Sequence, residues 1–223
     1  MDDVPAGSRS AVNGSGSTRW LVLGGAAAPV VLWTLGIVVA ATWPGYDPLA
    51  QSISLLVHAP LGGLQTAAFW AQGGLGLAWA IGAARVIGRD RRERWIVRGL
   101  FLLQSGIGFA FAVLPTDADG ERVTLVARLH LANFYLYAIS MPITLIVLAR
   151  VFARDPRWAT AAGGTRLAGT LMLVSIALVP LTVAGPLLPY LGALERIYVA
   201  IPSVWQFAVA RRALRVLAEA REA

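Results

Sequence analysis

The chain of 223 residues contains no cysteine, which excludes disulfide bonds, thiolate metal sites and cysteine nucleophiles. Histidine is almost as scarce, because only His58 and His130 are present. Lysine is absent as well, since all 19 basic residues are arginine. We attribute the missing lysine to a compositional bias toward Ala, Gly and Arg.

Charge is also sparse. Charged residues make up 14% of the chain, whereas a soluble domain has about 25%. Hydrophobic residues make up 57%, and the mean hydropathy is +0.65. So apolar a chain predicts a membrane protein. The net charge of +7 and pI of 10.9 would suggest a nucleic-acid partner in a soluble protein, but we expect no nucleic acid here because the arginines follow a membrane pattern.

Six apolar runs follow a polar, Gly- and Ser-rich segment at residues 1–19, which we expect to be a disordered cytoplasmic tail. The runs cover residues 20–42, 64–84, 96–114, 129–149, 167–184 and 193–210. Each is close to the ~20 residues that cross ~30 Å of hydrocarbon as a helix. The alternation of a membrane barrel is absent. We therefore predict an all-α fold, with a six-helix integral membrane domain over 20–210 and a basic cytoplasmic tail at 211–223.

The arginines predict the orientation. Sixteen of them fall in the segments that share a side with the amino terminus, and only Arg122, Arg128 and Arg196 fall on the other side. Short loops rich in arginine stay in the cytoplasm. We therefore expect a multi-pass cell-membrane protein with both termini cytoplasmic. The densest run, GRDRRERWIVR at 88–98, is expected to contact anionic lipid headgroups.

The first outer loop, WPGYDPLAQSISLLVHAP at 43–60, is rich in polar residues. Its Asp47-Pro48 pair is typical of a helix start, with Asp as cap and Pro in the first turn. We predict a short interfacial helix over 48–58. One face would be apolar and the other polar, carrying Gln51, Ser54 and His58.

Further polar residues cluster toward the same outer side. His130, Asn133 and Tyr137 recur at steps of three and four, which places them on one face of the fourth helix. Ionisable groups in a span cost at least ~2.5 kcal/mol near its centre and less at its ends. The candidate residues of an outward-facing polar pocket are Tyr46, Asp47, Ser54, His58, Asp117, His130, Asn133, Tyr137, Glu195 and Arg196. The alternative is that they only join helices, through an interfacial ion pair and hydrogen bonds.

The sequence resembles the bacterial multi-pass proteins of domain-of-unknown-function family 998. The resemblance rests on PGYDPLAQSISLL after the first run, LPTD after the third, LH at the start of the fourth and GALERI entering the sixth. It implies a six-helix integral membrane protein and no particular chemistry.

Three functions fit these features. The first is a non-enzymatic protein that binds or moves a small molecule or lipid through the pocket, without a cofactor. The second is an intramembrane metal-dependent hydrolase, although two histidines without ligand spacing are a weak metal signal. The third is a structural subunit of a complex, in which small residues such as Gly74, Ala78 and Gly82 pack against a partner. No phosphate-binding Gly loop and no Gly-x-Ser-x-Gly motif is present.

Overall fold

A computed structural model describes residues 6–118, 123–178, 181 and 186–222. Within these ranges the chain is all-helical, as predicted, with six α-helices and no strand. The elements are α1 (Ala6–Ala41), η1 (Ser54–His58), α2 (Gly62–Val86), α3 (Arg91–Val113), α4 (Leu125–Arg154), α5 (Ala159–Ala177), η2 (Leu188–Tyr190) and α7 (Leu191–Glu222).

Each predicted apolar run falls on one of these helices, but the first helix begins earlier than expected. We expected disorder over 1–19, whereas α1 already begins at Ala6. Extending a helix costs far less than starting one, so the apolar run can propagate a helix backward through weak helix formers. At the other end of the chain, α7 continues through the basic segment after 210 to Glu222.

Three helical segments in the described part of the chain are long and apolar enough to cross a membrane: Gly16–Ala41, Arg91–Val113 and Leu125–Arg154. The chain is therefore a membrane protein. The other three helices, α2, α5 and α7, do not meet this condition over their described residues. Gln65 and Gln72 lie within α2, and Glu195 and Arg196 lie in the second turn of α7. The apolar run that begins in α5 extends past Ala177 into residues that lie largely outside the described ranges.

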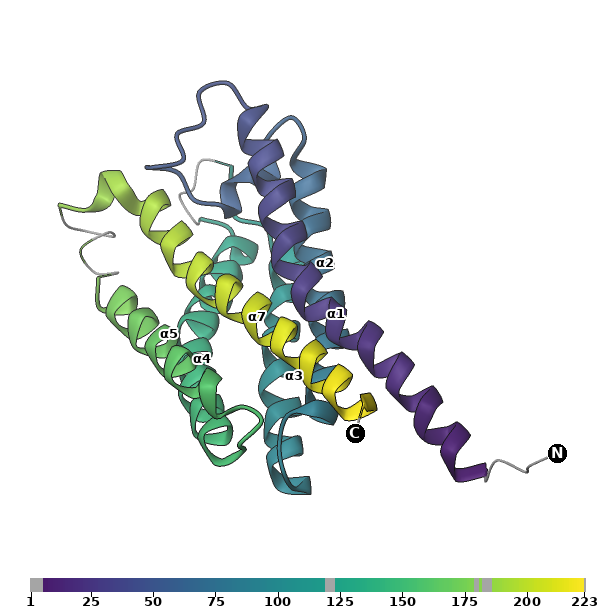
Figure 1. The fold of residues 1–223 in the computed structure, drawn as a ribbon. Helices are drawn as coiled ribbons and strands as arrows, with labels where there is room; N and C mark the ends of the chain where they lie inside the picture. Colours follow the sequence, from purple (N-terminus) through teal and green to yellow (C-terminus); the bar gives the residue numbers. More distant parts are fainter. Residues whose placement is uncertain (1–5, 119–122, 179–180, 182–185, 223) are drawn as a thin grey trace.

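The helices run alternately up and down, so the connections fall at two opposite ends of the bundle (Figure 1). One end carries the arginine-rich turns, the start of α1 and the end of α7. There, the Arg212 guanidinium donates to the Arg157 carbonyl at 2.8 Å, and Arg154 lies 3.8 Å from Glu93. The opposite end carries the loop from α1 to α2, the loop from α3 to α4, and the start of α7.

The predicted helix over 48–58 is wrong in extent. Residues 48–50 form a turn, and only Ser54–His58 is helical, as the 3₁₀ helix η1. Asp47 does cap this turn, because its Oδ1 accepts from the Leu49 amide at 2.8 Å. The loop does not need an α-helix to satisfy its backbone, since side chains of α7 bind its carbonyl and amide groups.

Candidate functional site

Arg196 on α7 holds the first outer loop. Its guanidinium donates to the carbonyl oxygens of Pro48 at 2.6 Å and Gln51 at 2.9 Å, and to the Tyr46 hydroxyl. It also lies over the Tyr46 ring, 5.5 Å from its centroid. A guanidinium offers five donors, so one side chain can satisfy several loop acceptors at once.

Tyr46 completes this contact from the loop side. Its hydroxyl donates to the Ser52 carbonyl at 2.8 Å. Burial raises the pKa of Tyr46, although the hydrogen bond and charge of Arg196 act in the opposite direction. The phenol is therefore neutral at physiological pH and keeps the proton that it donates.

Glu195, the neighbour of Arg196, binds a backbone amide of the same loop. Its Oε2 accepts from the Ile53 amide at 2.8 Å. Gly192, one turn earlier, makes this approach possible, because a Cβ there would collide with the Gln51 and Pro48 carbonyl oxygens. The two charged residues therefore fix the loop segment that leads into Ser54.

Ser54 and His130 come together from the first loop and from α4. His130 Nε2 lies 3.0 Å from Ser54 Oγ, and His130 Nδ1 lies 2.6 Å from the Leu114 carbonyl oxygen at the end of α3. Both side chains are buried, at 9% and 8% exposure. The ring is also packed against Phe111, with centroids 5.1 Å apart.

Asp117 positions His130 indirectly through the start of α4. Its carboxylate accepts from the amides of Val123 and Thr124 at 2.7 and 3.0 Å, and from the Thr124 hydroxyl at 2.6 Å. Thr124 in turn caps α4 by accepting from the Ala127 amide. The hydrogen bonds from Thr124 hold the pKa of Asp117 below its ordinary value. His58 braces the same loop, because its Nε2 lies 2.7 Å from the Thr116 carbonyl oxygen.

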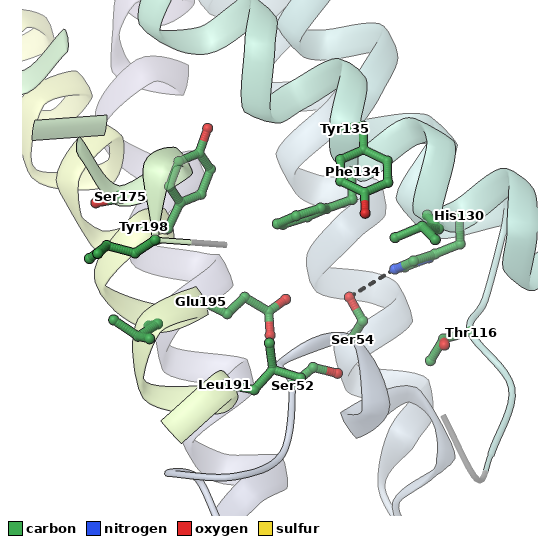
Figure 2. A pocket seen from close by; sticks show the side chains of 13 residues that line it. Ser52, Ser54, Thr116, His130, Phe134, Tyr135, Ser175, Leu191, Glu195 and Tyr198 are labelled. Carbon is green, nitrogen blue, oxygen red and sulfur yellow. Dashed lines mark hydrogen bonds between the residues drawn. The ribbon is translucent and has the colours of Figure 1, made fainter. Parts of the chain in front are cut away.

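A cavity of about 100 Å³ lies beside the serine and histidine. Figure 2 shows His130, Phe134 and Tyr135 of α4 on one side, and Leu191, Glu195 and Tyr198 of α7 on the other. Ser52 and Ser54 lie between them, with a dashed hydrogen bond from Ser54 to His130. Most of the exposed wall area is apolar. Ser52, Ser54 and Glu195 lie close together in the wall, while Ser175 lies on the far side of the cavity (Figure 2).

A second cavity, also of about 100 Å³, reaches deeper between the helices. It shares Ser54, Phe134 and Glu195 with the first, and Tyr137 lines it from α4. Gln72 and Gln104 line it too, and the side-chain oxygen of each is buried with no hydrogen-bond partner among the described residues. Buried acceptors of this kind call for a donor.

The structure thus separates the ten predicted residues into groups. Ser54, His130 and Glu195 share the first cavity, and Tyr137 joins Ser54 and Glu195 at the second. Tyr46, Asp47, Arg196, His58 and Asp117 bond to the loops of that end. Asn133 donates to the Ile107 carbonyl at 3.1 Å and so joins α4 to α3. Glu195 and Arg196 both bind backbone groups of the first outer loop.

Several lining residues were missed by the sequence analysis. Phe134 and Tyr135 are aromatic residues that ordinary helix packing would explain, so nothing in the sequence marks them. Tyr198 did carry a signal, because it lies three residues after Glu195 and therefore on the same face of α7. Gln72 and Gln104 did carry a signal, since an amide inside an apolar run needs partners. Gln104 Nε2 finds two, the hydroxyls of Ser140 and Thr144 at 3.1 and 3.2 Å.

Among the described residues, no group of three or more His, Asp or Glu side chains is placed to hold a metal ion. The metal-dependent hydrolase therefore lacks a ligand set in this part of the chain.

A family model described as "Protein of unknown function (DUF998)" matches residues 26–212. Neither the curated proteins nor the solved structures contain a match.

Proposed function

The chain belongs to the DUF998 family of proteins of unknown function, and we propose that it is a six-span cell-membrane protein that binds an amphiphilic molecule in the cavity beside Ser54. The single observation that carries the proposal is the composition of that cavity. Aromatic and leucine side chains form most of its wall, and the Ser54 hydroxyl, the His130 imidazole and the Glu195 carboxylate line it as well. Such a wall suits a ligand with an apolar chain and a polar head.

The arginine distribution supports the orientation in this proposal. The turns that are rich in arginine share one end of the bundle with the start of α1 and the end of α7 (Figure 1). The residues that line the cavity include Ser52, Ser54 and Thr116, which lie in the loops of the opposite end. By the positive-inside rule the arginine-rich end is cytoplasmic. The cavity then faces the outer leaflet, where an amphiphile can enter from the lipid.

Anionic lipid is the second partner in the proposal. A surface hollow at the arginine-rich end is lined by Arg85, Arg89, Arg91, Arg94 and Arg98, with Trp95 beside them. Trp95 is 57% exposed, and Arg98 lies over its ring at 5.0 Å. Clustered guanidinium groups next to an interfacial tryptophan suit phosphate headgroups of the inner leaflet.

The binding proposal is tested by photo-crosslinking with a diazirine-labelled monoacylglycerol in membranes that contain the protein. We expect crosslinked peptides from α4 and from the start of α7, the two sides of the cavity. Leu194→Trp places a bulky ring in the cavity wall and should lower the crosslinking at least about tenfold, since one filled subsite removes 1.4 kcal/mol or more.

The matched control is Leu188→Trp, which adds the same ring at an exposed position three residues before α7. Its crosslinking should equal that of the unchanged protein. Equal crosslinking of Leu194→Trp and the unchanged protein would contradict the binding proposal.

A further inference from the structure

When His130 is neutral, its contacts determine the direction of its hydrogen bond with Ser54. The Leu114 carbonyl oxygen can only accept, so the proton of the neutral imidazole lies on Nδ1, 2.6 Å away. Nε2 then carries a lone pair. The Ser54 hydroxyl, 3.0 Å from Nε2, must be the donor. A serine that donates to an imidazole nitrogen is the arrangement of a nucleophile with its general base.

The pair is held by surrounding contacts on both sides. The His130 ring is fixed by the Leu114 carbonyl and the edge of Phe111. Ser54 begins η1, and the residue before it is held by Glu195 through the Ile53 amide. Glu195 is therefore a positioning residue. Both reactive atoms belong to residues that line the cavity in which we place the amphiphile.

We propose that Ser54 and His130 cleave the ester bond of an acyl amphiphile bound in this cavity. The inference rests on the proposed binding function and adds a reaction to it. A backbone carbonyl stabilises an imidazolium less than the carboxylate of a serine hydrolase triad does. Esters fit this weaker base better than amides, because an alkoxide leaves more readily than an amine anion.

The proposed ester hydrolysis has two steps, acylation of Ser54 and hydrolysis of the acyl-serine. In the first, Ser54 Oγ bonds to the ester carbonyl carbon while its proton moves to His130 Nε2. The bond from that carbon to the alcohol oxygen breaks, and the proton passes from Nε2 to the leaving oxygen. In the second, water attacks the acyl-serine and gives one proton to Nε2, which returns it to Ser54 Oγ as the carboxylic acid leaves. Ester and water become acid and alcohol.

The test uses a fluorophosphonate with a long alkyl chain and a fluorescent tag, a probe that reacts covalently with activated serines. The purified protein in detergent should be labelled, and peptide mapping should place the label on Ser54. Ser54→Ala should abolish labelling. His130→Ala should slow it at least about a hundredfold, the lower end of general-base effects.

The matched control is Ser105→Ala, which removes another buried serine hydroxyl. Ser105 donates to the Gly73 carbonyl at 2.7 Å and is 4% exposed. Its labelling rate should be unchanged, and thermal melting of each variant in detergent shows whether it is folded. A folded, unchanged protein that is not labelled, or a label that persists in folded Ser54→Ala, would overturn the inference.

The crosslinking experiment separates this inference from the binding proposal. If the monoacylglycerol probe crosslinks to α4 and α7 but the fluorophosphonate does not react, the esterase inference fails and the binding function stands. If neither probe reacts with the folded protein, both fail. The inference is supported if Ser54 is labelled and the unchanged protein releases fatty acid from a monoacylglycerol, while Ser54→Ala releases none.

Discussion

At the scale of single residues, Asp155 shows how a buried carboxylate contributes to stability. It is 2% exposed and accepts from Arg157 through the backbone amide at 3.0 Å and the guanidinium at 2.7 Å. These hydrogen bonds and the charge of Arg157 hold the pKa of Asp155 below its ordinary value. Because the folded pKa is lowered, the stabilisation is complete above the ordinary value of about 3.9 and is lost as pH falls through the lower folded pKa.

We therefore predict that Asp155→Asn lowers the free energy of unfolding at pH 7 by about 1–3 kcal/mol, the range for a buried charged hydrogen bond. The difference from the unchanged protein should shrink in acid, where the aspartate itself is protonated. Thermal melting in detergent at a series of pH values measures this. Glu219→Gln is the control, since its pair with Arg212 is exposed and worth at most about 1 kcal/mol. If the difference in free energy of unfolding between Asp155→Asn and the unchanged protein stays constant with pH, the charge of Asp155 does not stabilise the fold.

At the scale of elements, α1 and α2 pack closely because glycine lies at their contact. A Cβ at Gly24 would lie 2.7 Å from the Leu75 carbonyl oxygen, and one at Gly82 would lie 2.9 Å from the Val22 nitrogen. Gly74, four residues from Ala78 in the same sequence pattern, has nothing within 4 Å of such a Cβ. The small residues Ala78 and Gly82 that would suit a partner protein thus face α1 of the same chain.

Gly82→Ala should consequently lower the free energy of unfolding by about 1–3 kcal/mol, the usual cost of overpacking. Gly74→Ala is the matched control and should be neutral or stabilising by about 0.5–1 kcal/mol, because alanine favours a helix interior. Chemical or thermal unfolding of both variants in the same detergent gives the comparison. Equal destabilisation by the two substitutions would show that the contact with α1 does not decide the effect.

The sequence predicts the helices better than it predicts contacts between segments that lie far apart in the chain. Helices follow from apolar runs, so their existence and order were predictable. The loop over 48–58 was predicted as an α-helix from the Asp47-Pro48 start. A local sequence pattern could not predict the contact with Arg196, which lies 148 residues from Pro48 and donates to the Pro48 carbonyl. Likewise, Ser54 and His130 were each predicted as pocket residues, but the contact between them depends on the loop that Glu195 holds.

At the scale of the whole molecule, the absence of cysteine allows a direct test of the four spans from α2 to α5. Single cysteines replace exposed residues at the two ends: Leu49→Cys, Val123→Cys and Tyr190→Cys at one, and Arg92→Cys and Thr160→Cys at the other. A maleimide that cannot cross membranes should label the first three in intact cells and the last two only after lysis. Labelling of Tyr190→Cys only after lysis, with the others as expected, would mean that α5 does not span.

The contacts of α7 with the first outer loop can form only late in the synthesis of the protein. Arg196 and Glu195 bind backbone groups that lie 148 and 142 residues earlier in the chain. A ribosome releases the loop long before it translates these two residues. During biogenesis the loop therefore lacks the hydrogen bonds from Arg196 and Glu195 until α7 has been made. A nascent chain stalled before Gly192 exposes those backbone groups to the proteases that degrade incompletely folded membrane proteins.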